Sequence, residues 1–205
     1  MERKRYYTFV EDSARWDGFE FRPGDILIST PPKCGTTWMQ RICSLLVFQT
    51  AKLDRTVSEY SPWLDMLVAP QEEVFARLAA QNHRRFIKTH TPLDGLPQVD
   101  DVFYVCVGRD PRDAAISINN HRINMDRDKF NAARALVAAD EGPDRSHLPP
   151  PAETEEGRFW QWVEDVTPPE EENSTLAATL NHYNQALAAE PTRSNVIVVH
   201  YLSLI

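Results

Sequence analysis

One short stretch, residues 25–38, restricts the fold more than any other part of the chain. It begins with an apolar run at residues 26–28, passes through a turn with two prolines and a glycine, and continues from Thr36 with apolar residues at helical spacing. A buried strand, a tight turn and a helix N-terminus together form an anion site, because the first N–H groups of the helix are free and the helix dipole favours negative charge. Lys33 adds a positive charge and Thr37 a hydroxyl donor, so the stretch predicts a site for phosphate or sulfate.

The turn differs from the nucleotide-binding P-loop. In that loop the lysine follows the second glycine and is itself followed by Ser or Thr. Here Lys33 precedes Gly35 by two residues, and no hydroxyl follows a Gly-Lys pair to hold magnesium. Two other interpretations account for part of the pattern: an ordinary strand-to-helix turn with a chance lysine, and a nucleotide kinase with an atypical loop.

Short apolar strands alternate with helices along the rest of the chain. The further predicted strands, all expected to be buried, are residues 85–90, 101–107 and 195–201, and the predicted helices include residues 36–48, 71–81 and 174–189. Strands of this kind separated by helices predict an α/β fold of three layers, in which helices cover both faces of a central parallel sheet. The apolar face expected for the last helix consists of Leu176, Leu180, Tyr183 and Leu187.

The length of 205 residues suits one domain with a sizeable core. No apolar run reaches the ~20 residues of a membrane-spanning helix, and the N-terminal residues lack the apolar core of a signal peptide. The three cysteines have no metal-ligand spacing and suit a reducing compartment, so we expect a cytoplasmic protein without a structural metal.

Acidic residues concentrate in one segment. Residues 140–172 contain eleven acidic and two basic residues, whereas the whole chain has a net charge of −8, so the remainder is close to neutral. This balance argues against nucleic acid as a partner, and we expect the acidic segment to be a solvated surface. Residues 122–152 are polar and end in three prolines, which predicts a mobile loop.

Two later segments carry further candidate residues. Lys88 and His90 close a predicted strand, and a histidine there titrates in the range useful for a general base. Arg109 leaves the strand at residues 101–107 just before a helix, and Ser117 lies about two turns into that helix. A guanidinium and a hydroxyl are suitable donors to phosphate.

Together these segments resemble the sulfotransferases that use 3′-phosphoadenosine 5′-phosphosulfate (PAPS), and among them the bacterial glycolipid and aryl types. Residues 31–38 read Pro-Pro-Lys-Cys-Gly-Thr-Thr-Trp and are similar to the family's 5′-phosphosulfate loop, Tyr-Pro-Lys-Ser-Gly-Thr-Thr-Trp. Residues 88–92 resemble its Lys-x-His-x-Pro segment, and residues 107–117 its 3′-phosphate motif. Residues 198–201 resemble the strand that leads into Tyr-Glu-Asp-Leu, but the acidic pair is absent. The resemblance covers about the first two thirds of the family's domain.

The resemblance implies the P-loop-like sulfotransferase fold and transfer of a sulfuryl group from PAPS to a hydroxyl of a small-molecule or glycolipid acceptor, with no metal. The implied catalytic residues are His90 as general base, with Lys33 and Lys88 stabilising negative charge. The residues implied to bind PAPS are Lys33, Cys34, Gly35, Thr36, Thr37, Trp38, Arg109 and Ser117.

The alternative is a truncated sulfotransferase-fold protein that only binds a phosphate or nucleotide. Because the family's closing loop is missing, we expect the 205-residue chain to bind PAPS weakly and to transfer sulfate poorly or not at all. The acceptor and the oligomeric state are not indicated by the sequence.

Overall fold

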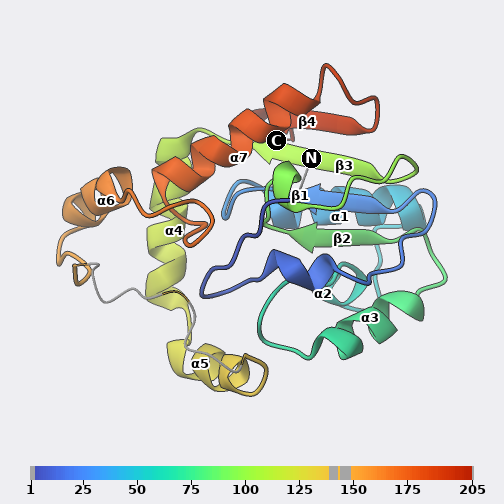
Figure 1. Cartoon of the computed structure of the whole chain (residues 1–205), viewed down its shortest axis with the longest axis horizontal. Coiled ribbons are helices and arrows are strands. Elements are labelled where there is room, and N and C mark those ends of the chain that lie inside the picture. Colours follow the sequence, from blue (N-terminus) through green and yellow to red (C-terminus); the bar gives the residue numbers. More distant parts are fainter. Residues whose placement is uncertain (1–2, 139–142, 144–148, 205) are drawn as a thin grey trace.

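A computed structural model gives the structure of the chain and describes residues 3–138, 143 and 149–204 (Figure 1). The strands are β1 (Ile26–Ser29), β2 (Phe86–Thr89), β3 (Phe103–Gly108) and β4 (Val196–His200). The α-helices are α1 (Thr36–Phe48), α2 (Val57–Tyr60), α3 (Gln71–Ala79), α4 (Pro111–Asn124), α5 (Arg127–Ala135), α6 (Glu155–Glu164) and α7 (Leu176–Ala189), and the 3₁₀ turns are η1 (Ser13–Trp16), η2 (Leu93–Gly95) and η3 (Tyr201–Leu204). Within the described ranges no helix is long and apolar enough to cross a membrane.

The four strands form one parallel sheet in the order β2-β1-β3-β4. The first strand of the chain therefore lies inside the sheet, where Ile28 pairs with Lys88 on one side and with Val105 on the other. This arrangement confirms the predicted α/β fold with a central parallel sheet. It also brings the segments that follow β1, β2 and β3 to the same carboxyl edge of the sheet.

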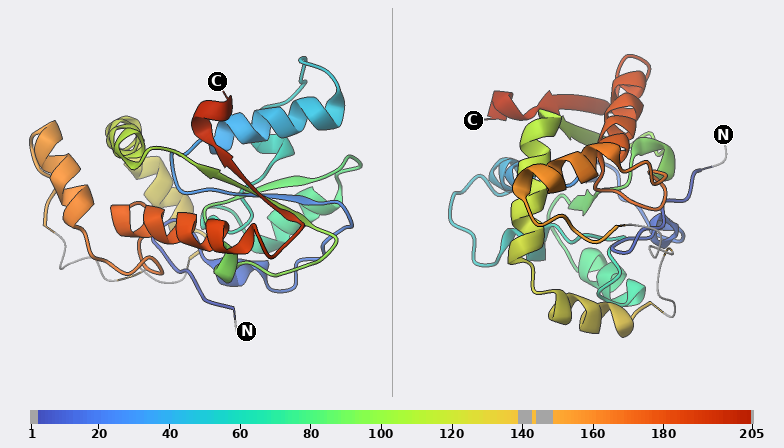
Figure 2. Two further views of the ribbon diagram at one scale, coloured as in Figure 1. Left: turned by 90° about the horizontal axis from the view of Figure 1, so that it is seen from above. Right: turned by 90° about the vertical axis from the view of Figure 1, so that its left-hand side faces the viewer.

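Helices cover both faces of the sheet because successive side chains of a strand point in opposite directions. Leu27 of β1 belongs to the larger core, which includes residues from η1, α3 and α7. Ile28 points to the other face and packs with Met39 and Cys43 of α1. The left view of Figure 2 shows the sheet between α1 and α7. The chain thus has the three predicted layers.

The buried face of α7 is not the one predicted. Its buried residues are Ala178, Thr179, His182 and Ala186. Leu180 and Leu187, which we expected to face the core, are 43% and 57% exposed. Three of these four are small, which allows the helix to lie close to the sheet, and the His182 ring lies 3.1 Å from the Ser29 hydroxyl of β1.

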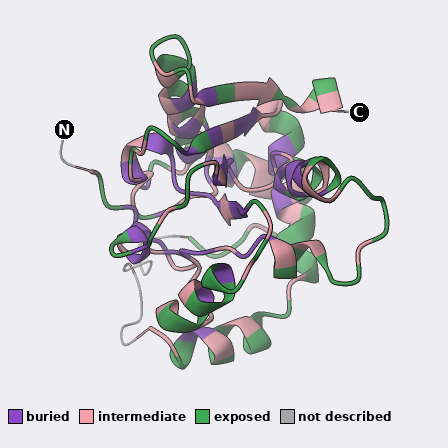
Figure 3. Cartoon of the chain, turned by 90° about the vertical axis from the view of Figure 1, so that its right-hand side faces the viewer, coloured by how far each residue is buried: buried purple, intermediate pink, exposed green. Residues whose placement is uncertain are grey.

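The last strand is also less buried than expected. β4 pairs with β3 on one side and is an edge strand of the described sheet. Only its first residue, Val196, is buried, and Ile197 is 48% exposed. Figure 3 shows this mixture of buried and exposed residues along β4.

The loop expected over residues 122–152 is partly helical. α4 continues to Asn124, and α5 begins after Asp126, whose carboxylate accepts a hydrogen bond from the Lys129 amide at 3.1 Å. This cap explains why a polar segment can form a helix. Residues 139–142 and 144–148 lie outside the described residues, and the mobility of the segment stays a prediction.

Helices α4, α5 and α6 lie beyond the carboxyl ends of the strands (Figure 1). α4 and α6 pack together through a small core of Ala115, Ile118 and Trp162. In open α/β sheets ligands bind at this edge. The fold therefore places these helices across from the candidate anion loop.

Candidate functional site

The turn between β1 and α1 has a left-handed backbone at two positions. Lys33 has φ 65° and Gly35 has φ 107°. A Cβ at Gly35 would lie 2.7 Å from Cδ2 of Tyr201, so both the conformation and the available space require glycine there. Gly35 is the N-cap of α1 and brings no capping side chain. The first N–H groups of α1 therefore remain available to an anion.

The loop's side chains lie in different surroundings. Lys33, Thr36 and Thr37 line the cavity described below, which places one charge and two hydroxyls at its wall. Trp38, in the first turn of α1, is 49% exposed. The predicted 5′-phosphosulfate loop is thus an accessible strand-to-helix turn, as the sequence indicated.

His90 lies where β2 ends, and its imidazole is fixed by one hydrogen bond. Its Nδ1 is 2.6 Å from the carbonyl oxygen of Thr30, the residue after β1. A carbonyl only accepts, so Nδ1 carries the proton and Nε2 keeps its lone pair. Burial holds the pKa of His90 well below its ordinary value, and the nearby charge of Lys88 lowers it further. His90 is therefore a neutral imidazole at pH 7, with the lone pair on Nε2.

Lys88 lies two residues before His90 on the same strand. Its Nζ is 4.0 Å from the ring centroid of Trp63, whose ring also contacts His90 edge-on at 4.5 Å. Burial lowers the pKa of Lys88 to about 8, while Glu11 and Asp65 act in the opposite direction. Most of the Lys88 side chains are therefore charged at pH 7, next to a neutral base.

Glu11 and Asp65 are two buried carboxylic acids near Lys88 that the sequence analysis missed. The Glu11 carboxylate accepts a hydrogen bond from the Asn173 side chain at 2.7 Å, and Asp65 accepts from two threonine hydroxyls and one indole N–H. Burial raises the pKa of Asp65 and raises that of Glu11 to about 8. No local motif marks either residue, because their partners come from distant parts of the chain.

The catalytic candidates face a cavity of about 1900 Å³. Its wall includes Lys33, Lys88 and His90, together with parts of the N-terminal arm (residues 3–22), residues 57–69 and helices α4, α5 and α6. The apolar side chains of the wall include Phe9, Val10, Trp63, Met66, Ile118, Ile123, Met125 and Phe130. Small-molecule pockets are typically about 300–1,000 Å³, so this cavity has room for an extended ligand.

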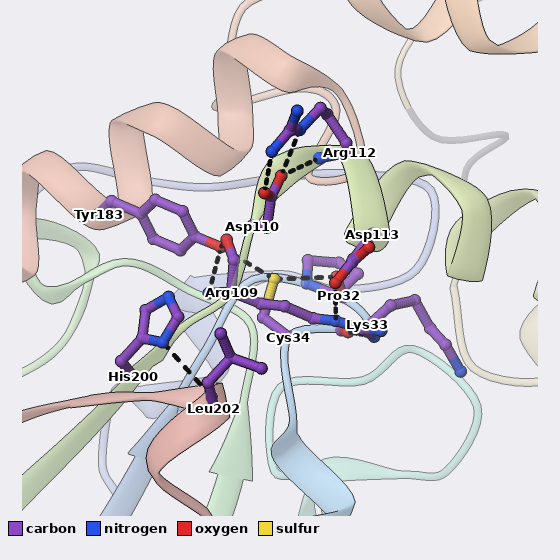
Figure 4. Close-up of polar contacts among 10 residues, drawn as sticks. All are labelled: Pro32, Lys33, Cys34, Arg109, Asp110, Arg112, Asp113, Tyr183, His200 and Leu202. Atoms are coloured by element: carbon purple, nitrogen blue, oxygen red, sulfur yellow. Dashed lines mark hydrogen bonds and ion pairs between the residues drawn. The ribbon is translucent and has the colours of Figure 1, made fainter.

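Arg109 approaches the anion loop from the end of β3 (Figure 4). Its Nη1 donates to the Lys33 carbonyl oxygen at 3.1 Å, and its guanidinium lies 4.7 Å from the ring centroid of Tyr201. Its Nε is buried, makes no hydrogen bond to the described residues, and lies 3.8 Å from Oδ2 of Asp113, with which it forms an ion pair. The structure thus joins Arg109 to the loop directly. Ser117 is half-buried about two turns into α4.

Tyr183 joins the same two segments and was also missed as a site residue. Its hydroxyl contacts the backbone of Arg109 and lies 3.2 Å from Sγ of Cys34. Burial raises the pKa of the Cys34 thiol to about 11, so the thiol is neutral. The sequence showed Tyr183 only as part of an apolar helical pattern, which gives no signal for a polar contact.

The family model for the sulfotransferase domain matches residues 23–204. A glycolipid sulfotransferase of Mycobacterium tuberculosis strain H37Ra is 46% identical over 176 residues, which cover 82% of this chain and 53% of the relative. A glycolipid sulfotransferase of Mycobacterium bovis BCG is 47% identical over 177 residues, with the same coverage. The chain spans about half the length of the curated relatives it matches.

Solved structures share the fold at low sequence identity. Mouse sulfotransferase SULT7A1 complexed with PAP superposes with a TM-score of 0.61 and 16% identity, covering 93% of this chain and 56% of that one. Retinol dehydratase in a complex with retinol and PAP gives a TM-score of 0.56 and 21% identity, covering 92% of this chain and 57% of that one. These likenesses establish the fold.

Proposed function

The chain belongs to the sulfotransferase family, and we propose that it takes part in transfer of a sulfuryl group from PAPS to a hydroxyl of a glycolipid acceptor. The observation that carries this proposal is the pairing of a neutral His90, whose lone pair is on Nε2, with Lys33 and Lys88 on the wall of one cavity. A base and two cations in one cavity suit attack by a hydroxyl on an anionic donor.

His90 accepts the acceptor's hydroxyl proton at Nε2 while the acceptor oxygen forms a bond to sulfur. The bond from sulfur to the bridging phosphate oxygen breaks, and its electron pair leaves with adenosine 3′,5′-bisphosphate. The products are a sulfate ester, the bisphosphate and a proton on His90. Lys33 and Lys88 stabilise the negative charge on the transferring and leaving groups, as fixed charges do in phosphoryl transfer.

The donor is proposed to bind across two segments. The free N–H groups of α1, Lys33 and Thr36 to Trp38 hold its 5′-phosphosulfate end, and Arg109 with Ser117 holds its 3′-phosphate. The left-handed turn supports this assignment, and so does the hydrogen bond from Arg109 to the Lys33 carbonyl oxygen, which joins the two segments. PAP in the solved neighbours supports the same donor class.

A glycolipid acceptor is supported by the size and lining of the cavity and by the names of the bacterial relatives. Sugar hydroxyls of such a lipid supply the attacking oxygen, and its apolar chain suits the side chains of the arm and α5. We also propose a reducing compartment, the cytoplasm, as the place of action, since the three cysteines are buried free thiols.

The test is an assay of the purified chain with PAPS and either a neutral glycolipid or a simple phenol, with products read by mass spectrometry. We expect slow transfer, in line with the weak donor binding expected from the sequence, with the sulfated glycolipid formed faster than the sulfated phenol. Sulfated phenol as the main product would contradict the proposed acceptor. Bisphosphate binding without transfer to either acceptor would support the binding-only alternative instead.

A further inference from the structure

The hydroxyl of Tyr183, on α7, lies at the junction of the two anion-binding segments (Figure 4). It accepts a hydrogen bond from the Arg109 amide at 2.8 Å and donates to the Arg109 carbonyl oxygen at 2.7 Å. The same oxygen is 3.2 Å from Sγ of Cys34 in the loop after β1. One hydroxyl thus contacts both the segment that ends β3 and the loop that begins α1.

We propose that Tyr183 is a positioning residue that sets the spacing between the anion loop, residues 33–37, and the Arg109 segment, so that one ligand with two anionic groups can occupy both. The ligand class, an adenosine 3′,5′-bisphosphate, rests on the proposed function. Tyr183 itself is not assigned a contact with that ligand.

Hydrogen-bond geometry makes this junction specific. The Tyr183 hydroxyl donates its proton to the Arg109 carbonyl oxygen. The lone pairs of the hydroxyl oxygen therefore face the Arg109 amide N–H and the neutral thiol of Cys34. Burial raises the pKa of Tyr183, so the hydroxyl keeps its proton at pH 7. Because both backbone groups of Arg109 are held, the point from which its side chain leaves is fixed relative to α7.

Further contacts extend the same junction. Arg109 Nη1 donates to the Lys33 carbonyl oxygen at 3.1 Å, and the Tyr201 ring lies under the guanidinium and against Gly35. Without the Tyr183 hydroxyl, the Arg109 amide and carbonyl lose their partners and the segment can move relative to the loop. A ligand that bridges two subsites depends on their spacing, whereas a ligand of one subsite does not.

The experiment compares two ligands on two variants by calorimetry. Tyr183→Phe keeps the ring and removes only the hydroxyl. We expect it to weaken binding of adenosine 3′,5′-bisphosphate by about tenfold, the effect of lost buried hydrogen bonds, and to change binding of adenosine 5′-monophosphate by less than about twofold. The ratio of the two affinities is the readout, since general destabilisation lowers both affinities together.

Tyr104→Phe is the matched control. The Tyr104 hydroxyl also brackets two backbone groups, accepting from the Val99 amide at 3.0 Å and donating to the Pro97 carbonyl, but it lies near the start of β3 rather than its end. We expect it to leave the affinity ratio unchanged. An unchanged ratio in Tyr183→Phe, or an equal loss in both variants, would overturn the positioning role.

Three further outcomes are decisive. If Tyr183→Phe does not fold, Cys34→Ala removes the loop's side of the junction and should lower the ratio by a smaller factor, and an unchanged ratio in that folded variant would overturn the inference. If the wild-type chain binds both ligands equally, the proposed donor site fails together with the inference. A wild-type preference that survives Tyr183→Phe overturns the inference alone.

Discussion

The two regions of the proposed site are held together in different ways. On the proposed donor side, the loop before α1 and the segment after β3 are joined by hydrogen bonds from Arg109 to the Lys33 carbonyl and from Tyr183 to Arg109. On the proposed acceptor side, the wall is made by side chains from the arm, residues 57–69 and helices α4 to α6. The donor side is a hydrogen-bonded frame, whereas the acceptor side is an assembly of separate surfaces.

This difference suggests a division of tasks. A frame with fixed hydrogen-bond donors suits one invariant ligand, because the positions of the donors determine how strongly they bind the phosphate and sulfate oxygens. A broad wall of side chains suits ligands that are recognised by shape and apolar contact. Changes on the donor side should therefore affect chemistry and donor affinity, and changes on the acceptor side should affect the acceptor's KM.

The largest expected effect comes from His90, which lies between the two sides. His90→Ala should lower kcat by about 10²–10⁴-fold and leave bisphosphate affinity nearly unchanged, because a positioned base acts on the acceptor proton. Steady-state kinetics and calorimetry measure the two effects separately. His90→Asn is the matched control, since its amide can still donate to the Thr30 carbonyl but is not a base. Wild-type kcat in His90→Ala would remove histidine from the mechanism.

The next largest effect is expected for Lys33, which belongs to the donor-side frame and not to the acceptor-side wall. Lys33→Ala should lower kcat by about 10²–10³-fold, as removal of a charge-stabilising donor does in other enzymes, and should also weaken donor binding. The left-handed φ of 65° is equally unfavourable for both side chains, so backbone strain does not change. Lys52→Ala, at an exposed lysine away from the cavity, is the control. Donor affinity equal to wild type in Lys33→Ala would contradict the proposed contact.

The pH profile tests Lys88. Because burial lowers its pKa to about 8, the charged form is lost as pH rises through 8, and kcat/KM for the donor should fall about fivefold between pH 8 and 9. Between pH 7 and 6 the rate should stay level, since the pKa of His90 is well below its ordinary value. Glu11, with a pKa raised to about 8 by burial, titrates in the same alkaline range.

Lys88→Arg separates these two groups. Arginine stays charged throughout, so the alkaline fall should disappear if Lys88 causes it. A fall that persists in the variant would assign the titration to Glu11 or another group.

The sequence predicted the frame better than the wall for a physical reason. The loop, its lysine and the following helix are contiguous, so local geometry and a short motif describe them. The start of α4 has a local signal of the same kind, because the Asp110 side chain caps the helix by accepting a hydrogen bond from the Arg112 amide. The Lys33, Lys88 and His90 positions follow from the ends of parallel strands, which always meet at one edge.

The missed residues depend on contacts between distant parts of the chain. Cys34 and Tyr183 are 149 residues apart, and Glu11 and Asn173 are 162 apart. Periodicity gave the wrong buried face for α7, because it weighs the large apolar side chains and not the close approach that Ala178 and its small neighbours allow. A local sequence pattern indicates neither a contact between distant residues nor the close approach of a helix to the sheet.

The smallest expected effect lies on the wall. Phe130 of α5 lines the cavity, and its ring is 5.8 Å from that of Phe9 of the arm. Phe130→Ala removes part of the apolar surface offered to a lipid chain. Because α5 lies at the edge of the molecule and Phe130 is only half-buried, the fold should be retained. We expect the glycolipid KM to rise about fivefold, the value of partial burial of an aromatic ring, with kcat and bisphosphate affinity unchanged.

Ile197→Ala, at an exposed apolar residue of β4 outside this cavity, should change none of the three. If Phe130→Ala instead weakens bisphosphate binding as strongly as it raises the acceptor KM, the two sides are coupled, and the separation between frame and wall does not hold.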